Sequence, residues 1–115
     1  AVNMAGYAAS NVLRGDVALW EPEELEAPDP ARVLLDVRTL QEFQQGTIPG
    51  AELAPVDELR DRSEDYPRDR EYLVFCQVGL RGYLAARILA QRGFRVRNLS
   101  GGFKRYCLEQ ASKRP

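Results

Sequence analysis

Histidine is absent from this sequence, and its absence removes several kinds of chemistry. Ser-His-Asp and Cys-His catalysis, zinc sites with imidazole ligands and imidazole proton transfer all need that side chain. Cysteine is scarce as well: Cys76 and Cys107 are too few for a disulfide scaffold and lie in unrelated sequence contexts. We therefore expect at least one free thiol, and the nucleophilic chemistry that remains is that of a cysteine without a histidine base.

Long apolar runs and blocks of like charge are also missing. No run approaches the roughly 20 apolar residues that a membrane helix requires, and the N-terminus lacks the basic-then-apolar layout of a signal peptide. The formal net charge is -1, with acidic and basic residues scattered, so nothing favours nucleic acid or an anionic membrane as a partner. We expect a cytoplasmic protein that acts on small or protein-borne substrates.

The size of the chain and the order of its apolar segments predict one principal α/β domain. The chain has 115 residues, of which 44% are hydrophobic, enough for a sizeable core. Two apolar runs, one at 33–37 that is interrupted only by Asp36 and one at 72–75, are typical of strands buried on both faces. Shorter strands are expected at 17–20, 51–54 and 95–99, alternating with helical segments. This alternation predicts a parallel sheet of about five strands, flanked by helices on both faces.

Local signals place the helices between these strands. Thr39 and Glu42 have the spacing of a capping box, which predicts a short helix at 40–45 that begins after Thr39 and stops at Gly46. Further helices are expected at 55–62, 81–93 and 102–111, the last two bounded by glycines. On the helix at 81–93, the predicted core candidates are Leu84, Ile88 and Leu89. The aromatic residues Trp20, Phe43, Phe94 and Phe103 are core candidates as well.

The stretch 71–82 places a lone thiol between a strand and a helix. The apolar run that ends at Phe75 predicts a buried strand, and an Ala/Leu/Ile pattern of helical period begins after Arg81. Cys76 lies between them and faces a helix N-terminus, where unpaired N–H groups and the helix dipole favour an anion. Gly79 allows unusual backbone angles, so that successive N–H groups can turn inward around the sulfur. We therefore predict a reactive thiolate at Cys76, with Arg81 adding positive charge at the rim; the alternative is an inert, buried cysteine.

Two charged residues are expected beside this loop. Asp36 and Arg38 follow the other long apolar strand, and open parallel sheets bind ligands outside the carboxyl ends of their strands. We expect either that Asp36 orients Arg81 through a charge-assisted hydrogen bond while Arg38 contacts substrate or lies at the surface, or that they serve in a structural ion pair. Cys107 is predicted either to resolve a disulfide with Cys76 or to be a core or partly buried thiol.

Five motifs occur in order along the chain: Leu35-Asp36-Val37-Arg38, Glu42-Phe43, Gly46-Thr47-Ile48-Pro49-Gly50-Ala51, Cys76-Gln77-Val78-Gly79-Leu80-Arg81 and Leu99-Ser100-Gly101-Gly102-Phe103. Together they resemble the motifs of the rhodanese (sulfurtransferase) family, in which the loop cysteine takes up a sulfane sulfur as a persulfide and an acceptor then removes it. The resemblance implies a rhodanese-like domain at 16–115, with Cys76 as nucleophile and Arg81 holding an anionic donor. It also implies that the persulfide is bound by the loop residues Gln77, Val78, Gly79, Leu80 and Gly82.

A further resemblance concerns the segment Asn3-Met4-Ala5-Gly6-Tyr7-Ala8-Ala9-Ser10-Asn11-Val12-Leu13-Arg14-Gly15. It is similar to the closing segment of the FAD-dependent coenzyme A disulfide reductase family, some members of which carry a C-terminal rhodanese domain. The resemblance implies that residues 1–15 are the trailing helix of an upstream reductase domain, the alternative being an ordinary amphipathic N-terminal helix. No cofactor is expected in this fragment, whereas FAD and NAD(P)H would bind in the parent protein. The expected partners are those reductase domains and small sulfur donors or acceptors, namely thiosulfate, persulfide, polysulfide and coenzyme A thiols.

Two other functions fit parts of this pattern. A cysteine phosphatase also sets Cys and Arg around an oxyanion, but the tyrosine class has five residues between them, whereas four separate Cys76 from Arg81. The shorter loop favours a terminal sulfur over a phosphoryl group. The second is a binding or regulatory module that has the fold but does no turnover, against which the intact Cys76 weighs.

Overall fold

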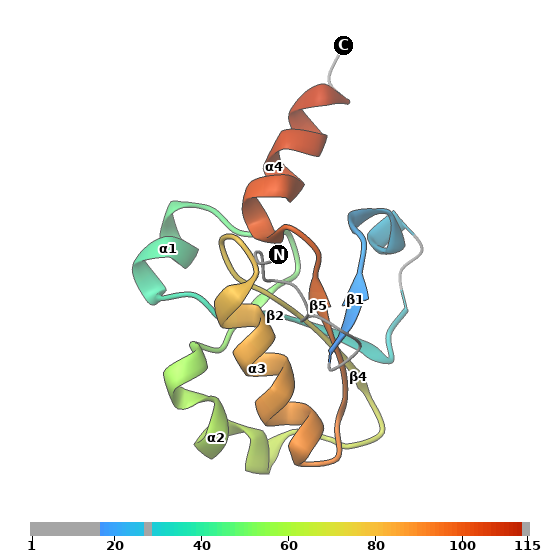
Figure 1. The fold of residues 1–115 in the computed structure, drawn as a ribbon, viewed down its shortest axis with the longest axis vertical. Helices are drawn as coiled ribbons and strands as arrows, with labels where there is room; N and C mark the ends of the chain where they lie inside the picture. The colour runs from blue at the N-terminus through green and yellow to red at the C-terminus, as the bar shows by residue number, and fades with distance from the viewer. Residues whose placement is uncertain (1–16, 27–28, 114–115) are drawn as a thin grey trace, which may run out of the picture.

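The computed structural model of the chain describes residues 17–26 and 29–113. Within these residues, five parallel strands form one sheet in the order β1-β5-β4-β2-β3 (Figure 1). The most apolar strand, β4, takes the central position, as its continuous hydrophobic sequence requires. The predicted parallel sheet is therefore confirmed, while the predicted helix at 1–15 lies outside the described residues. The strands are β1 (Ala18–Trp20), β2 (Arg32–Asp36), β3 (Glu52–Leu53), β4 (Glu71–Phe75) and β5 (Arg95–Leu99).

Helical segments cover both faces of the sheet, as predicted. On one face, buried side chains of α2 and α3 share a core with residues of β2 and β4. On the other face, apolar side chains of η1 and α4 pack with residues of β1, β4 and β5. The helical segments are η1 (Pro22–Glu26), α1 (Leu40–Gln45), η2 (Val56–Glu58), α2 (Leu59–Arg62), η3 (Ser63–Asp65), α3 (Leu80–Gln91) and α4 (Gly102–Ser112).

The side chains of β4 alternate between the two cores. Tyr72 and Val74 belong to the core under α3, whereas Leu73 and Phe75 belong to the core on the opposite face. Successive residues of a strand point to opposite faces, so an apolar side chain at every position is what a central strand needs. Each of these buried side chains contributes about 1.5–3 kcal/mol by leaving water, which fixes the position of the strand that leads into Cys76.

The short helix α1 is stabilised by hydrogen bonds at its N-terminus. The Glu42 N–H donates to the Thr39 hydroxyl, and the Thr39 N–H donates to the Glu42 carboxylate, so the predicted capping box is confirmed. Phe43 is only half-buried, and the helix has no buried residue. Of the aromatic core candidates, only Trp20 and Phe94 are buried.

The buried face of α3 differs from the predicted one. Ala85, Ala86 and Leu89 are completely buried, whereas Leu84 is 47% exposed. The small alanine side chains let the helix lie close to the sheet, so the longer Leu84 side chain lies on the outer face. The prediction that Leu84 belongs to the core is therefore wrong, and that for Leu89 is confirmed.

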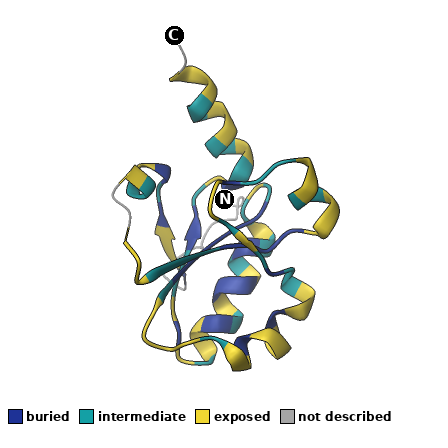
Figure 2. Cartoon of the chain, turned by 180° about the vertical axis from the view of Figure 1, so that it is seen from behind, coloured by how far each residue is buried: buried dark blue, intermediate teal, exposed yellow. Residues whose placement is uncertain are grey.

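The last helix, α4, extends away from the body of the molecule (Figures 1 and 2). Its only fully buried residue is Gly102, at the end that touches the sheet, while Phe103 and Tyr106 pack half-buried against the core. Beyond this first part, Leu108 is 64% exposed. Among the described residues, no helix is both long and apolar enough to cross a membrane.

Candidate active site

Cys76 directly follows the central strand and is enclosed by the loop that leads into α3. The residue is 1% exposed, and the Gly79 N–H donates to its Sγ at 3.0 Å. Gly79 is the N-cap of α3 and has a φ of 120°, a backbone conformation that residues with a Cβ rarely adopt. The predicted strand, glycine loop and helix around a lone thiol are thus confirmed.

The first turn of α4 holds the carbonyl groups of this loop. The Phe103 N–H donates to the Cys76 carbonyl at 2.7 Å, and the Lys104 N–H donates to the Gln77 carbonyl at 3.0 Å. The first N–H groups of a helix have no partner within it, so they are free to make these bonds. In a trans peptide the N–H points opposite to the C=O, so the N–H groups of Gln77 and Val78 point away from α4. The loop therefore presents donors rather than acceptors on its other side.

This contact requires a glycine at the start of α4. A Cβ on Gly102 would lie 2.5 Å from the Gln77 carbonyl oxygen and 2.7 Å from that of Cys76. Both atoms belong to backbone and cannot move without shifting the loop. Gly102 therefore allows the helix to approach the loop closely, whereas the sequence indicates only that a glycine bounds the helix here.

Asn98, a residue of β5, binds the loop that follows Cys76. It is buried, and its Nδ2 donates to the Gly79 carbonyl at 3.0 Å. Its Oδ1 has no hydrogen-bond partner among the described residues and occupies the space that a Cβ on Gly82 would need. The sequence offers one signal for Asn98, which is that asparagine is uncommon within strands. Gly82 is thus a packing residue.

Arg81 binds Glu42 of α1 rather than Asp36. Two hydrogen bonds, of 2.7 Å and 2.9 Å, join its guanidinium to both carboxylate oxygens. The hydrogen bonds from Arg81 lower the pKa of Glu42 to about 2, with a further contribution from the Thr39 N–H. The pKa of Arg81 is raised chiefly by its hydrogen bonds to Glu42. The predicted Asp36–Arg81 hydrogen bond is wrong, because a closer carboxylate from α1 satisfies the guanidinium.

Asp36 and Arg38 form a buried ion pair. Arg38 donates to both carboxylate oxygens of Asp36, at 2.9 Å and 2.8 Å, and its guanidinium lies 4.3 Å from the centre of the Phe103 ring. It also donates to the Gly46 carbonyl at 2.6 Å and to the Gln77 side chain at 3.3 Å. With Arg38 only 3% exposed and Asp36 fully buried, the structural alternative is supported and the predicted substrate or surface position of Arg38 is not. The pair ties the end of β2 to the loop after Cys76.

The other predicted loop residues form its rim. Val78, in the loop, and Leu80, the first residue of α3, are 62% and 68% exposed. Cys107, by contrast, does not reach the loop core: it lies on the part of α4 that extends into solvent and is exposed. The prediction of a core or partly buried Cys107 is therefore wrong. Both thiols are free.

The family model for the rhodanese-like domain matches residues 18–109, which include the loop and every residue that holds it. The chain belongs to the rhodanese-like family. It is 41% identical over 71 residues to a sulfurtransferase of Allochromatium vinosum, covering 61% of this chain and 66% of that one. It is 34% identical over 111 residues to the human thiosulfate:glutathione sulfurtransferase, covering 84% of this chain and 95% of that one.

Parts of two longer chains of known structure are also similar. The reduced CoADR-RHD of Bacillus anthracis is 43% identical with a TM-score of 0.84, and the match covers 96% of this chain. The NAD-dependent persulfide reductase of A. fulgidus is 37% identical with a TM-score of 0.66, over 82% of this chain. The matched part is 20% of the first of those chains and 16% of the second. This rhodanese-like chain thus spans a fifth or less of each.

Proposed function

We propose that this domain is a sulfurtransferase that carries a sulfane sulfur as a persulfide on Cys76. The observation that supports this most strongly is the loop geometry. Two carbonyls are bound by α4 and a third by Asn98, while the Gly79 N–H donates to Sγ. A cradle of backbone donors suits the negative charge of a thiolate or of a terminal sulfur.

The proposed transfer has two steps, in which Cys76 first takes up a sulfur atom and then releases it to an acceptor. The Cys76 thiolate attacks the outer sulfur of thiosulfate or of a persulfide, the S–S bond of the donor breaks, and its electron pair leaves with sulfite or with a thiolate. A new S–S bond remains on Cys76. An acceptor such as cyanide or a thiol then attacks the outer sulfur, and the Cys76 thiolate leaves. No histidine is needed, because the acceptor brings its own nucleophile.

Arg81 acts in this proposal as a positioning residue. Both terminal nitrogens of its guanidinium donate to the Glu42 carboxylate, and this ion pair joins α1 to the first turn of α3. For Arg81 to hold an anionic donor, as the family resemblance implies, the pair with Glu42 would have to open. The same pairing disfavours the phosphatase alternative, which needs an arginine turned toward the oxyanion.

We further propose that the parent protein is a reductase of coenzyme A disulfide, coenzyme A persulfide or polysulfide. Similarity to CoADR-RHD and to an NAD-dependent persulfide reductase supports this proposal, as does the resemblance of residues 1–15 to the end of a reductase domain. FAD and NAD(P)H would bind in the parent's reductase domains, which would be partners of this domain in the cytoplasm. Cys76 would then pass sulfur to, or receive it from, the coenzyme A thiols handled there.

Turnover of thiosulfate and cyanide to thiocyanate tests the proposal on the 115-residue chain. We expect activity in the wild type and in Cys107→Ser, and none in Cys76→Ser. Cys107 is the matched control because it is the other free thiol and is exposed. If the wild type neither turns over nor takes up sulfur from any donor, the domain is a non-catalytic binding module instead.

A further inference from the structure

Two arginines flank the Cys76 loop, and each is bound to a carboxylate. Arg81, in the first turn of α3, donates to both oxygens of Glu42 at 2.7 Å and 2.9 Å. Arg38 is paired in the same way with the buried Asp36. The hydrogen bonds from Arg81 lower the pKa of Glu42 to about 2, so this carboxylate is ionised at neutral pH. Each guanidinium therefore has its charge balanced by a carboxylate at the site.

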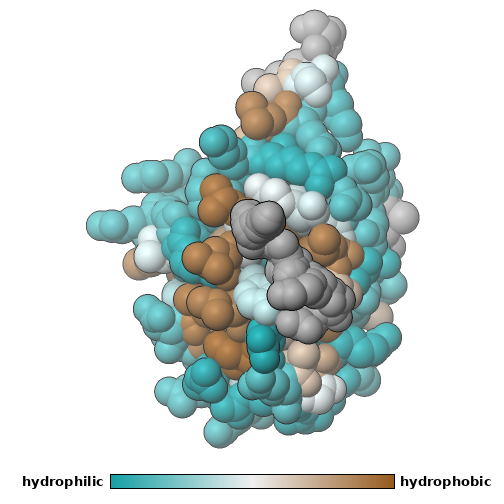
Figure 3. Space-filling model, in the orientation of Figure 1, coloured by the Kyte–Doolittle hydropathy of each residue, from teal (hydrophilic) through white to brown (hydrophobic). Residues whose placement is uncertain are grey.

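Large apolar side chains are exposed in the loop and along α3. Val78 and Leu80, on either side of Gly79, are 62% and 68% exposed, and Leu84, about one turn after Leu80, is 47% exposed. Figure 3 shows apolar surface that continues from the level of the loop downward over α3. A sulfur donor built on carbon can bury part of itself against these side chains, whereas an inorganic anion cannot.

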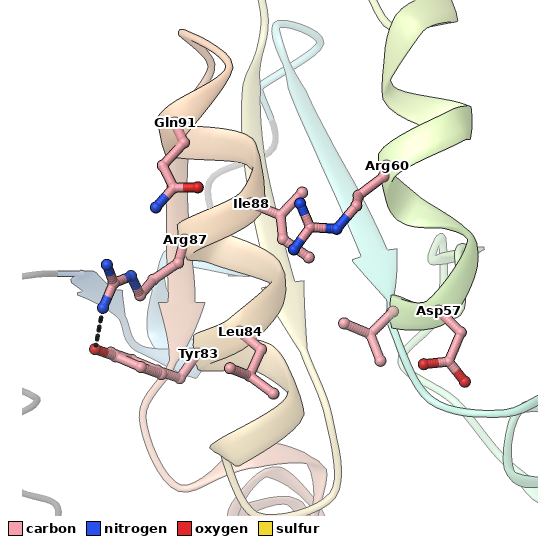
Figure 4. A pocket seen from close by; sticks show the side chains of 8 residues that line it. Asp57, Arg60, Tyr83, Leu84, Arg87, Ile88 and Gln91 are labelled. Carbon is pink, nitrogen blue, oxygen red and sulfur yellow. Dashed lines mark hydrogen bonds between the residues drawn. The ribbon is translucent and has the colours of Figure 1, made fainter.

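Two further arginines beside α3 lie further along the helix. Arg87 follows Arg81 by six residues, which is about 9 Å along the helix axis, and it donates to the Tyr83 hydroxyl at 3.3 Å. Arg60 of α2 reaches toward Ile88 across the trough between the two helices (Figure 4). Arg81, within the first turn of the helix whose N-cap N–H binds the sulfur, is therefore the arginine of α3 that is placed to meet a donor.

We propose that Glu42 is a specificity-determining residue of this site. By pairing with Arg81 it disfavours small anionic sulfur donors, such as thiosulfate, and favours persulfides carried on uncharged groups. The inference rests on the proposed function and adds to it a choice among the donors that Cys76 can use. Glu42 acts here through Arg81 and not on the sulfur itself.

The two kinds of donor make different demands on Arg81. With thiosulfate, the Cys76 thiolate attacks the outer sulfur, the S–S bond breaks, and sulfite leaves with the electron pair and two negative charges. With a persulfide R–S–SH, the thiolate attacks the outer sulfur, R–S− leaves with the electron pair, and the proton stays on the sulfur transferred to Cys76. The first donor and its leaving group are dianions that need a cation nearby, whereas the second needs only the N–H groups of the loop.

The ion pair must open before Arg81 can bind an anionic donor. The Arg81 and Glu42 side chains are 34% and 30% exposed, and a pair that is hydrated to this degree shifts an equilibrium by a factor of about 5 at most. A donor that binds only when Arg81 is free has its apparent affinity reduced by the fraction of the protein in that state. We therefore expect the pair to weaken thiosulfate binding about 5-fold and to leave an uncharged persulfide unaffected.

The proposal is tested by the rate at which Cys76 takes sulfur from three donors, followed by intact-mass spectrometry. Thiosulfate is the small anion, 2-hydroxyethyl persulfide is the uncharged carrier, and 2-sulfoethyl persulfide has a similar arm that ends in a sulfonate. In Glu42→Gln we expect kcat/KM to rise about 5-fold for thiosulfate, chiefly through a lower KM, and more than about 2-fold for the sulfoethyl donor. For the hydroxyethyl donor the change should be less than about 2-fold. Glutamine still accepts the Thr39 N–H, so the capping box of α1 is kept.

Two further variants separate the effect of charge from a structural effect. In Glu42→Gln/Arg81→Gln the gain with thiosulfate should vanish, because it requires the freed guanidinium. Glu71→Gln is the matched control, because Glu71 also binds arginines, Arg32 and Arg97, but lies at the other end of β4 from the loop, about 17 Å away. In that variant no donor should change by more than about 2-fold.

Each other outcome overturns the proposal. Equal changes with all three donors in Glu42→Gln would show that the variant alters the loop itself, and no gain with thiosulfate would show that the freed Arg81 does not bind the anion. A gain that persists without Arg81 would assign the effect to the lost carboxylate alone. In all of these cases the wild type still loads Cys76, so they differ from failure of the proposed function, in which no donor loads it.

Discussion

The helices α3 and α4 both begin beside Cys76, yet they contribute in opposite ways. Each starts after a glycine with positive φ, Gly79 for α3 and Gly101 for α4. α3 is buried against the sheet along its length through Ala85, Ala86 and Leu89, whereas α4 buries only Gly102. α3 supplies the N–H of its N-cap to the sulfur, while α4 supplies N–H groups to the carbonyls behind it.

The two helices therefore have different roles at the site, since α3 binds the sulfur and α4 binds the loop carbonyls. The N-terminus of α3 faces the reacting sulfur. The N-terminus of α4 binds the loop carbonyls, so that these carbonyls point away from the sulfur. α4 can perform its task with one turn, which explains why the rest of the helix extends into solvent without loss of the site. The loop is thus held by backbone contacts that depend on glycine, together with the side chains of Asn98 and Arg38.

The largest effect is expected where α4 meets the loop. Gly102→Ala places a Cβ against the Cys76 and Gln77 carbonyls, so the loop must shift, and we expect sulfur loading to slow about 100-fold. Gly101→Ala is the matched control, because it imposes the same kind of backbone strain but meets the Arg105 side chain of α4 itself. Loading rates of the two variants check this. Equal rates would mean that the contact of α4 with the loop is not what orients it.

Asn98 allows the next test, on the α3 side of the loop. Asn98→Ala removes the donor to the Gly79 carbonyl, and we expect about 1–3 kcal/mol loss of unfolding free energy and about 10-fold slower loading. Asn98→Asp keeps the shape but sets an acceptor against that carbonyl, so it should be less stable than the alanine variant at pH 7. Urea unfolding measures both. An aspartate variant as stable as wild type would contradict the role of the Nδ2 hydrogen bond.

The Glu42–Arg81 pair predicts a pH dependence at the start of α3. The pKa of Glu42 is lowered from 4.5 to about 2, so its stabilising contribution is fully present above about pH 5 and is lost as the pH falls toward 2. Glu42→Gln should therefore cost up to about 1 kcal/mol at pH 7, a partly exposed pair being worth no more, and almost nothing at pH 2. Urea titrations at pH 7, 4 and 2 compare the two proteins. A difference that does not shrink on acidification would contradict the pairing.

The smallest effect is expected on the outer part of α4. Leu108 is exposed and follows the turn that touches the loop, so Leu108→Gln should change the unfolding free energy by less than about 0.5 kcal/mol. Sulfur loading should be unchanged. Thermal unfolding and a loading assay on the same sample check both. Slower loading in this variant would show that the projecting part of α4 takes part in the reaction.

Short-range features of the site could be predicted from the sequence, and long-range pairings could not. The strand before Cys76, the positive-φ Gly79 and the capping box of Thr39 depend on neighbours in sequence, where periodicity and turn chemistry apply. The Arg81–Glu42 pair joins residues 39 positions apart, and its geometry depends on where the sheet places α1. The sequence correctly predicts Glu42 in the capping box, but the same carboxylate also binds Arg81.

The sequence pattern does not predict the buried face of α3 correctly, for a related reason. This helix carries two apolar stripes, one of Ala85, Ala86 and Leu89 and one that includes Leu84. Helical period alone cannot tell which stripe faces the sheet, and the larger side chains favoured the wrong one. The close approach that alanines permit decides the matter in the folded protein, and the remaining stripe becomes surface beside the active-site loop.

Intact-mass spectrometry tests the central claim, that the loop held by α3 and α4 stabilises a persulfide on Cys76. The chain is treated with thiosulfate, desalted and weighed before and after cyanide. We predict that wild type and Cys107→Ser gain one sulfur atom and lose it to cyanide, while Cys76→Ser gains none. A sulfur that Cys76→Ser gains and loses in the same way would contradict the account.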